Sequence, residues 1–128
     1  MDSAKILVVD DSIDNLLLTQ ILLEGEGHQI RTALEAEQAL QILQYWRPHL
    51  ILMDLQLPGM DGLELTRKLR QDPDLGSIPI VAITAYAMGG DEEKARAAGC
   101  AGYITKPIDT RKFPGEVARF LHPVPAAS

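Results

Sequence analysis

The sequence predicts an α/β protein in which one parallel β-sheet is covered by helices on both faces. Two observations lead to this fold class. Five short apolar segments alternate along the chain with five segments of helical periodicity. The apolar segments do not alternate between apolar and polar residues, which is typical of strands buried on both faces of a parallel sheet. Because crossover connections are right-handed, all five strands should run in the same direction.

The first half of the chain contains three of the predicted strands and two of the predicted helices. A β-branched run, Lys5–Val9, forms the first strand. The helix that follows can be capped by Asp11 or Ser12, and Gly25 and Gly27 end it. The predicted strands cover residues 5–9, 29–32 and 50–53, and the predicted helices cover residues 13–24 and 34–45.

The second half continues the same alternation after a loop that is marked by Pro58 and Gly59. A last helix, capped by Asp109 or Thr110, should end near Leu121. The other predicted helices cover residues 63–70 and 91–98, and the predicted strands cover residues 78–83 and 102–105.

A chain of 128 residues with 46% apolar residues is sufficient for one globular domain. We expect residues 1–123 to form this domain and residues 124–128 to be a flexible C-terminal tail. The apolar runs are far shorter than the ~18 residues needed to cross a membrane, and the N-terminus lacks a signal-peptide core. A cytoplasmic protein without membrane contact is therefore expected.

Charge and cysteine content exclude several classes of function. The net charge is −6, and the twelve Lys and Arg residues are scattered, which argues against a nucleic-acid surface. The single Cys100 cannot form an internal disulfide and should act as a small apolar residue. No spacing of the three histidines with Cys100 resembles a zinc site.

Polar residues stand at the carboxyl ends of four predicted strands. Asp10 and Asp11 follow the first strand and Asp54 the third, while Thr84 ends the fourth and Lys106 follows the fifth. Parallel strands bring these ends to one edge, where open α/β sheets bind ligands. Three close carboxylates repel one another unless a cation lies among them, and their hard oxygen atoms suit Mg²⁺. With a lysine and a hydroxyl nearby, the pattern predicts phosphoryl transfer to a carboxylate.

Most of these residues have a simpler interpretation when taken alone. The aspartates after the first strand could be helix caps. Thr84 could be an ordinary strand end, Tyr103 a rim aromatic and Lys106 a solvated charge. Asp54 is harder to explain in this way, because a carboxylate that ends a fully apolar strand is costly to bury without a partner.

Four segments, "VVDDS", "LILMDLQLPGMDGLEL", "VAITAYA" and "GYITKPID", resemble the receiver domain of two-component response regulators. They match in order and spacing from about Lys5 to Leu121. The resemblance implies a flavodoxin-like, doubly wound sheet of five parallel strands in the order 2-1-3-4-5, with five helices.

The resemblance also implies roles for the carboxylates. Asp54 corresponds to the phosphoacceptor. The direct ligands of Mg²⁺, or of Mn²⁺, would be Asp11, Asp54 and the backbone carbonyl of Gln56, and Asp10 would hold a metal-bound water.

Four further residues take their roles from the same resemblance. The Thr84 hydroxyl and the Lys106 ammonium would contact the phosphoryl group. Tyr103 matches the aromatic residue that turns inward as Thr84 moves. The peptide bond before Pro107 is expected to be cis, which sequence alone would favour in only about 5–6% of cases.

The function expected from the resemblance is a phosphorylation-dependent switch in a phosphorelay. A histidine kinase or histidine phosphotransfer protein would donate the phosphoryl group, and the chain would act by contact with a further protein. It would not be an enzyme beyond Mg²⁺-dependent self-phosphorylation and autodephosphorylation. We expect a monomer or a phosphorylation-linked dimer, either a single-domain, chemotaxis-type regulator or the receiver of a hybrid histidine kinase.

Three alternatives from other classes fit the sequence less well. An aspartate-nucleophile phosphohydrolase of the haloacid-dehalogenase type needs a second aspartate where Gln56 stands. A flavodoxin-like electron carrier needs a phosphate-binding loop where Asp10 and Asp11 would repel the phosphate. A receiver-shaped binding module that never takes phosphate does not need the complete set of acids, Thr84 and Lys106.

Overall fold

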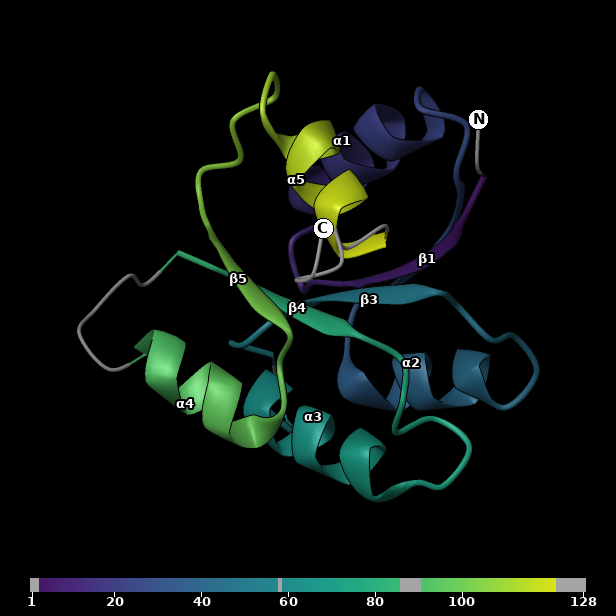
Figure 1. The fold of residues 1–128 in the computed structure, drawn as a ribbon, viewed down its shortest axis with the longest axis vertical. Helices are drawn as coiled ribbons and strands as arrows, with labels where there is room; N and C mark the ends of the chain where they lie inside the picture. Colours follow the sequence, from purple (N-terminus) through teal and green to yellow (C-terminus); the bar gives the residue numbers. More distant parts are fainter. Residues whose placement is uncertain (1–2, 58, 86–90, 122–128) are drawn as a thin grey trace, which may run out of the picture.

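One parallel sheet of five strands lies between two layers of helices in the computed structural model (Figure 1). The structure describes residues 3–57, 59–85 and 91–121, so the predicted tail at 124–128 lies outside it. The elements in chain order are β1 (Lys5–Val9), α1 (Ile13–Glu24), β2 (Gln29–Ala33), α2 (Ala36–Leu43), β3 (Leu50–Asp54), α3 (Gly62–Gln71), β4 (Ile80–Thr84), α4 (Asp91–Ala98), β5 (Gly102–Thr105) and α5 (Phe113–Leu121). Their strand order, β2-β1-β3-β4-β5, confirms the predicted fold.

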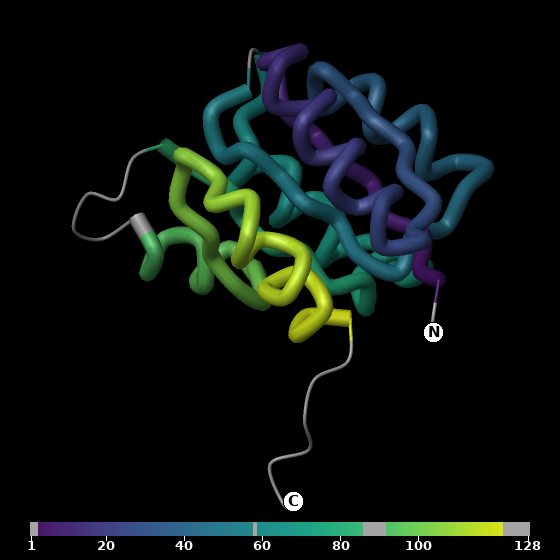
Figure 2. Tube along the Cα trace, turned by 90° about the horizontal axis from the view of Figure 1, so that it is seen from above, coloured from purple at the N-terminus to yellow at the C-terminus, as the bar shows by residue number. Residues whose placement is uncertain are grey.

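The helices divide between the two faces of the sheet, with α1 and α5 on one face and α2, α3 and α4 on the other (Figures 1 and 2). Successive residues of each strand point to opposite faces of the sheet, and so to different helix layers. In β1, Ile6 and Val8 pack with the α1–α5 layer, whereas Leu7 and Val9 pack with the α2–α4 layer. This double burial is the reason why the inner strands β1, β3 and β4 are largely apolar. The edge strand β2 differs from the prediction, because its residues Gln29, Arg31 and Thr32 are polar and exposed.

Two element boundaries differ from prediction because local hydrogen bonds compete with helix formation. The backbone N–H of Leu34 donates to the side-chain oxygen of Gln38 at 2.8 Å, and α2 begins only at Ala36. Before α5, the carboxylate of Asp109 accepts the N–H groups of Arg111 and Lys112. These bonds stabilise a turn, so α5 starts at Phe113 and not directly after Asp109.

The start of β4 also differs from prediction. The strand begins at Ile80 and not at Ile78, since Pro79 has no N–H to donate to a neighbouring strand. The carbonyl of Pro79 still accepts a hydrogen bond from the N–H of Ile51 at 3.0 Å. The shorter strand leaves the carboxyl end, where Thr84 lies, unchanged.

Strand register brings the carboxyl ends of the strands to one edge. Val9, the last residue of β1, pairs with Met53, so Asp10 follows β1 at the level where Asp54 ends β3. Asp54 pairs with Ile83 on β4. Thr84 pairs with Thr105, which directly precedes Lys106. Among the described residues, no helix combines the length and the apolar composition that crossing a membrane would require.

Candidate functional site

Three carboxylates meet at the carboxyl edge of the sheet. Asp10, Asp11 and Asp54 each offer one oxygen atom, and these atoms lie within 4.8 Å of one another. Asp10 and Asp54 are only 5% and 6% exposed, whereas Asp11 is exposed. The sequence predicted this convergence, and the structure adds that the three acids differ in their access to solvent.

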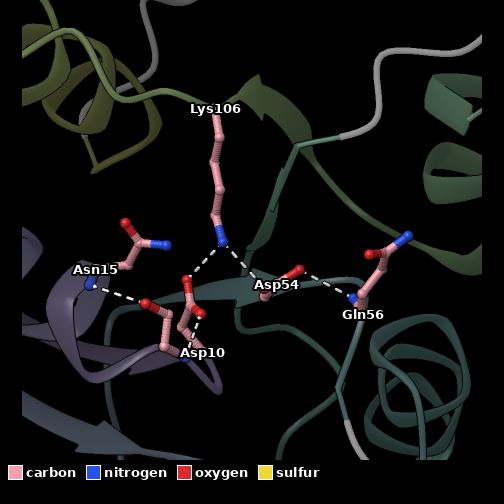
Figure 3. A network of polar contacts seen from close by, with 6 residues as sticks. Asp10, Asn15, Asp54, Gln56 and Lys106 are labelled. Atoms are coloured by element: carbon pink, nitrogen blue, oxygen red, sulfur yellow. Dashed lines mark hydrogen bonds and ion pairs between the residues drawn. The ribbon is translucent and has the colours of Figure 1, made fainter.

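Lys106 lies between the two buried carboxylates (Figure 3). Its Nζ atom is 2.8 Å from Oδ2 of Asp10 and 3.0 Å from Oδ2 of Asp54. The backbone N–H of Lys106 donates to the carbonyl of Thr84 at 2.8 Å, which joins the segment after β5 to the end of β4. One ammonium group therefore holds β1 and β3 together at the site.

Asp10 and Asp54 are held by the same local motif. Oδ1 of Asp10 accepts the N–H of Ser12, and Oδ1 of Asp54 accepts the N–H of Gln56, both at 2.9 Å. In this arrangement a carboxylate binds the backbone two residues further along, as aspartates often do at turns. In each buried carboxylate, one oxygen thus accepts a backbone N–H and the other contacts the Lys106 ammonium.

The helix that follows this site is capped by Ser12. The Ser12 hydroxyl accepts the N–H of Asn15, which leaves the side chain of Asp11 outside the capping interaction. Of the two capping residues that the sequence allowed, the structure selects Ser12.

Burial and charge shift two pKa values at the site. Burial raises the pKa of Asp54, with a smaller upward contribution from the charge of Asp10, while hydrogen bonds from Gln56 and Lys106 partly offset the rise. Burial by itself would lower the pKa of Lys106, but its hydrogen bonds to Asp10 and Asp54 outweigh this effect and raise that pKa. Lys106 therefore stays cationic and compensates the negative charge of the two carboxylates.

The other predicted site residues lie around this centre. Thr84 is buried at the end of β4, and Gln56 is exposed two residues after Asp54. Tyr103 is half-buried in β5, packs against the core and pairs in register with Ala82, two positions before Thr84. The peptide bond between Lys106 and Pro107 is cis, the geometry that the family resemblance implies.

The acidic cluster fits a hard divalent cation. Its three carboxylates supply oxygen donors only, which are the ligands of Mg²⁺ and Mn²⁺. Neither histidine nor cysteine belongs to the cluster in the described part of the chain. Sequence reasoning did not find that Lys106 binds two of these carboxylates at once, because that contact joins three strands.

Comparisons with known proteins identify the family of this chain. The family model for the response regulator receiver domain matches residues 6–118. The polar-differentiation response regulator DivK of Brucella anthropi is 40% identical over 117 residues, which cover 91% of this chain and 95% of that protein.

Two solved structures extend the comparison. The chemotaxis response regulator CheY4 of Vibrio cholerae has a TM-score of 0.87 at 27% identity, covering 93% of this chain and 99% of that one. The Mn²⁺-bound form of the response regulator Rcp1 has a TM-score of 0.83 at 29% identity, covering 95% of this chain and 97% of that one. With the family match, the strand order and the acidic edge in agreement, this chain belongs to the response regulator receiver domains of two-component signalling.

Proposed function

We propose that this receiver domain accepts a phosphoryl group on Asp54 from a histidine kinase or a histidine phosphotransfer protein. The observation that carries the proposal is the placement of Asp54. Its carboxylate ends a fully buried strand, has one oxygen fixed by the N–H of Gln56 and has the other on the Lys106 ammonium. A buried carboxylate with a fixed orientation and an adjacent cation suits a nucleophile for an anionic group.

The proposed transfer forms an acyl phosphate. An oxygen of Asp54 attacks the phosphorus atom of a phosphohistidine, an O–P bond forms and the N–P bond breaks. The electron pair of the broken bond stays on the imidazole nitrogen, which takes up a proton. Lys106, already 3.0 Å from Asp54, neutralises charge on the oxygen atoms of the moving group.

Four groups of the chain would hold the divalent cation. We assign Asp11, Asp54 and the backbone carbonyl of Gln56 as direct ligands of Mg²⁺ or Mn²⁺, and Asp10 as a ligand through water. The bound ion supplies positive charge that lowers the repulsion between the carboxylates and the incoming phosphoryl oxygens. Support comes from the short distances among the three carboxylates and from the exposure of Asp11.

The proposed output depends on Thr84 and Tyr103. Thr84 is buried at the same edge, and its carbonyl accepts the N–H of Lys106. We assign its hydroxyl to contact the phosphoryl group on Asp54. Movement of Thr84 would then change the packing of Tyr103 on the neighbouring strand. The altered surface of α4, β5 and α5 would be read by a further protein.

A surface beside the site suits the phosphodonor. Ile13, Leu17 and Ile21 are 61%, 53% and 67% exposed and follow one another at intervals of four residues along α1. Residues four apart lie on one face of a helix, so these side chains form an apolar stripe. The stripe begins two residues after Asp11. A partner that presents its histidine to Asp54 would cover it.

The test is the intact mass of the protein after incubation with acetyl phosphate and Mg²⁺. We expect a base-labile gain of one phosphoryl group in the natural protein and none in Asp54→Asn. Asp74→Asn, at an exposed turn outside the site, is the matched control and should be labelled normally. A gain that survives Asp54→Asn, or no gain in the natural protein, would contradict the proposal.

A further inference from the structure

A cavity of about 380 Å³ lies at the beginning of α2, on the side of the sheet opposite to α1. Its size is in the range of cavities that hold a ligand group. Two segments line it, the first residues of α2 and the connection between β3 and α3. The lining residues are Glu35, Ala36, Glu37, Leu40, Gly59 and Met60.

The apolar residues that line this cavity pack on the core of the protein. Ala36 is buried, and Leu40 and Met60 pack against the hydrophobic core of the α2–α4 layer. Both side chains are only partly covered by the protein, so an aliphatic chain that fills the cavity would remove apolar surface from water.

The rim of the cavity is acidic, and its carboxylates are not used by the fold. Glu37 is exposed and Glu35 is half-buried, and neither takes part in an ion pair within the described residues. Glu35 occupies the N-cap position of α2 but makes no capping hydrogen bond. Gln38 reaches back to Leu34 instead. The Glu35 carboxylate is therefore available to a ligand.

The cavity belongs to the same edge of the sheet as the phosphoacceptor. The carbonyl of Ala33, the last residue of β2, accepts the N–H of Asp10 at 3.0 Å, so the entry to α2 is joined to the acidic site. Gly59 and Met60 lie in the segment that leads from Asp54 to α3. A partner that docks over Asp54 is therefore expected to contact the segments that line this cavity.

We infer that the cavity receives a lysine or arginine side chain of the protein that docks on this edge. The aliphatic stem of such a side chain would lie on Leu40 and Met60, and its charged head would reach Glu35 and Glu37. An anionic ligand would be repelled by the two carboxylates. The identity of this partner as the phosphodonor rests on the proposed function, whereas the chemistry of the cavity does not.

The first experiment measures the cavity directly. The unphosphorylated protein is titrated without metal with N-acetyl-arginine amide, and the amide NMR shifts of residues that line the cavity are followed. N-acetyl-citrulline amide, which has the same shape without the charge, should bind several-fold more weakly. Exposed ion pairs contribute about 0.2–1 kcal/mol, so Glu35→Gln and Glu37→Gln should each weaken arginine binding about threefold.

A matched variant controls for net charge. Glu24→Gln combined with Glu26→Gln removes two exposed acids at the C-terminal end of α1, away from the residues that line the cavity. This variant should leave arginine binding unchanged. Equal binding of the arginine and citrulline probes would overturn the inference. So would a loss of arginine binding in this control that equals the loss in Glu35→Gln combined with Glu37→Gln. Tighter binding of spermidine than of the arginine probe would assign the cavity to a free polyamine and would also overturn it.

The second experiment uses a phosphorylated histidine phosphotransfer protein as donor. Glu35→Gln combined with Glu37→Gln should raise the KM for this donor and leave labelling by acetyl phosphate unchanged. An unchanged KM would overturn the role of the cavity in docking. If Asp54 does not accept phosphate, neither donor labels the natural protein, and the proposed function fails. The arginine titration of the first experiment does not depend on this result, so it tests the cavity separately.

Discussion

Asp10, Asp11 and Asp54 are the same type of residue in three different settings. Asp10 and Asp54 are buried and each binds a backbone N–H and Lys106. Asp11 is exposed, and its side chain makes no hydrogen bond to any described residue. The free carboxylate is the one best placed to bind a cation directly, while Asp10 is already engaged by the protein.

This difference predicts unequal losses of metal affinity. Asp10→Ala removes a group that we propose to act through water. The change should weaken Mg²⁺ binding about tenfold, in the range found for outer-shell partners of metal ligands. Asp11→Ala removes a proposed direct ligand and should weaken Mg²⁺ binding further. Calorimetric titration with Mg²⁺ measures both, and thermal unfolding of each variant checks that it folds. Equal losses, or a larger loss for Asp10→Ala, would contradict the assignment.

Among the secondary-structure elements, α1 is apolar on two sides. Leu16 and Leu23 are buried against the sheet, while Ile13, Leu17 and Ile21 face solvent. A helix that only supported the fold would need one apolar face, so the second face indicates a contact with another protein.

The α1 stripe predicts a selective defect for Leu17→Glu. Because Leu17 is exposed, the change should alter the free energy of unfolding by about 0.5 kcal/mol or less. Transfer from a phosphohistidine protein should slow at least several-fold, whereas labelling by acetyl phosphate should not change. Tyr45→Glu, which also removes an exposed apolar side chain, is the control and should transfer normally. A Leu17→Glu protein that accepts phosphate normally from the protein donor would exclude the stripe as the docking surface.

For the molecule as a whole, the parallel sheet concentrates negative charge at one edge. The arrangement places three acids together, and Lys106 compensates only part of their charge. Repulsion among them opposes folding, and a bound cation removes it. The fold and the metal site are therefore thermodynamically linked.

This linkage predicts that Mg²⁺ stabilises the folded protein. At a Mg²⁺ concentration ten times the Kd, the free energy of unfolding should rise by about 1.4 kcal/mol. For a domain of this size, the Tm should rise by about 5 °C. Thermal unfolding with and without EDTA measures the effect, and NaCl at matched ionic strength is the control. An equal rise in Asp11→Ala or in NaCl would show that the stabilisation does not come from the site.

Local patterns in the sequence account for the order and type of the elements and for the residues at the strand ends. Apolar runs, helical spacing and glycine or proline positions are local signals, and they were sufficient for five strands, five helices and a parallel sheet. Boundaries were less well predicted where a side chain forms a turn, as Gln38 and Asp109 do. The strand order came from family resemblance, since no local pattern specifies which strands are neighbours.

The contacts between these residues depend on how the sheet and the helices pack. The contact of Lys106 with Asp10 and Asp54 joins β5 to β1 and β3, because strand order and register bring these ends together. The cavity between α2 and the segment after β3 and the exposure of one α1 face likewise depend on helix packing against the sheet. Sequence patterns report what each segment prefers, whereas distances between segments are set by how the layers pack.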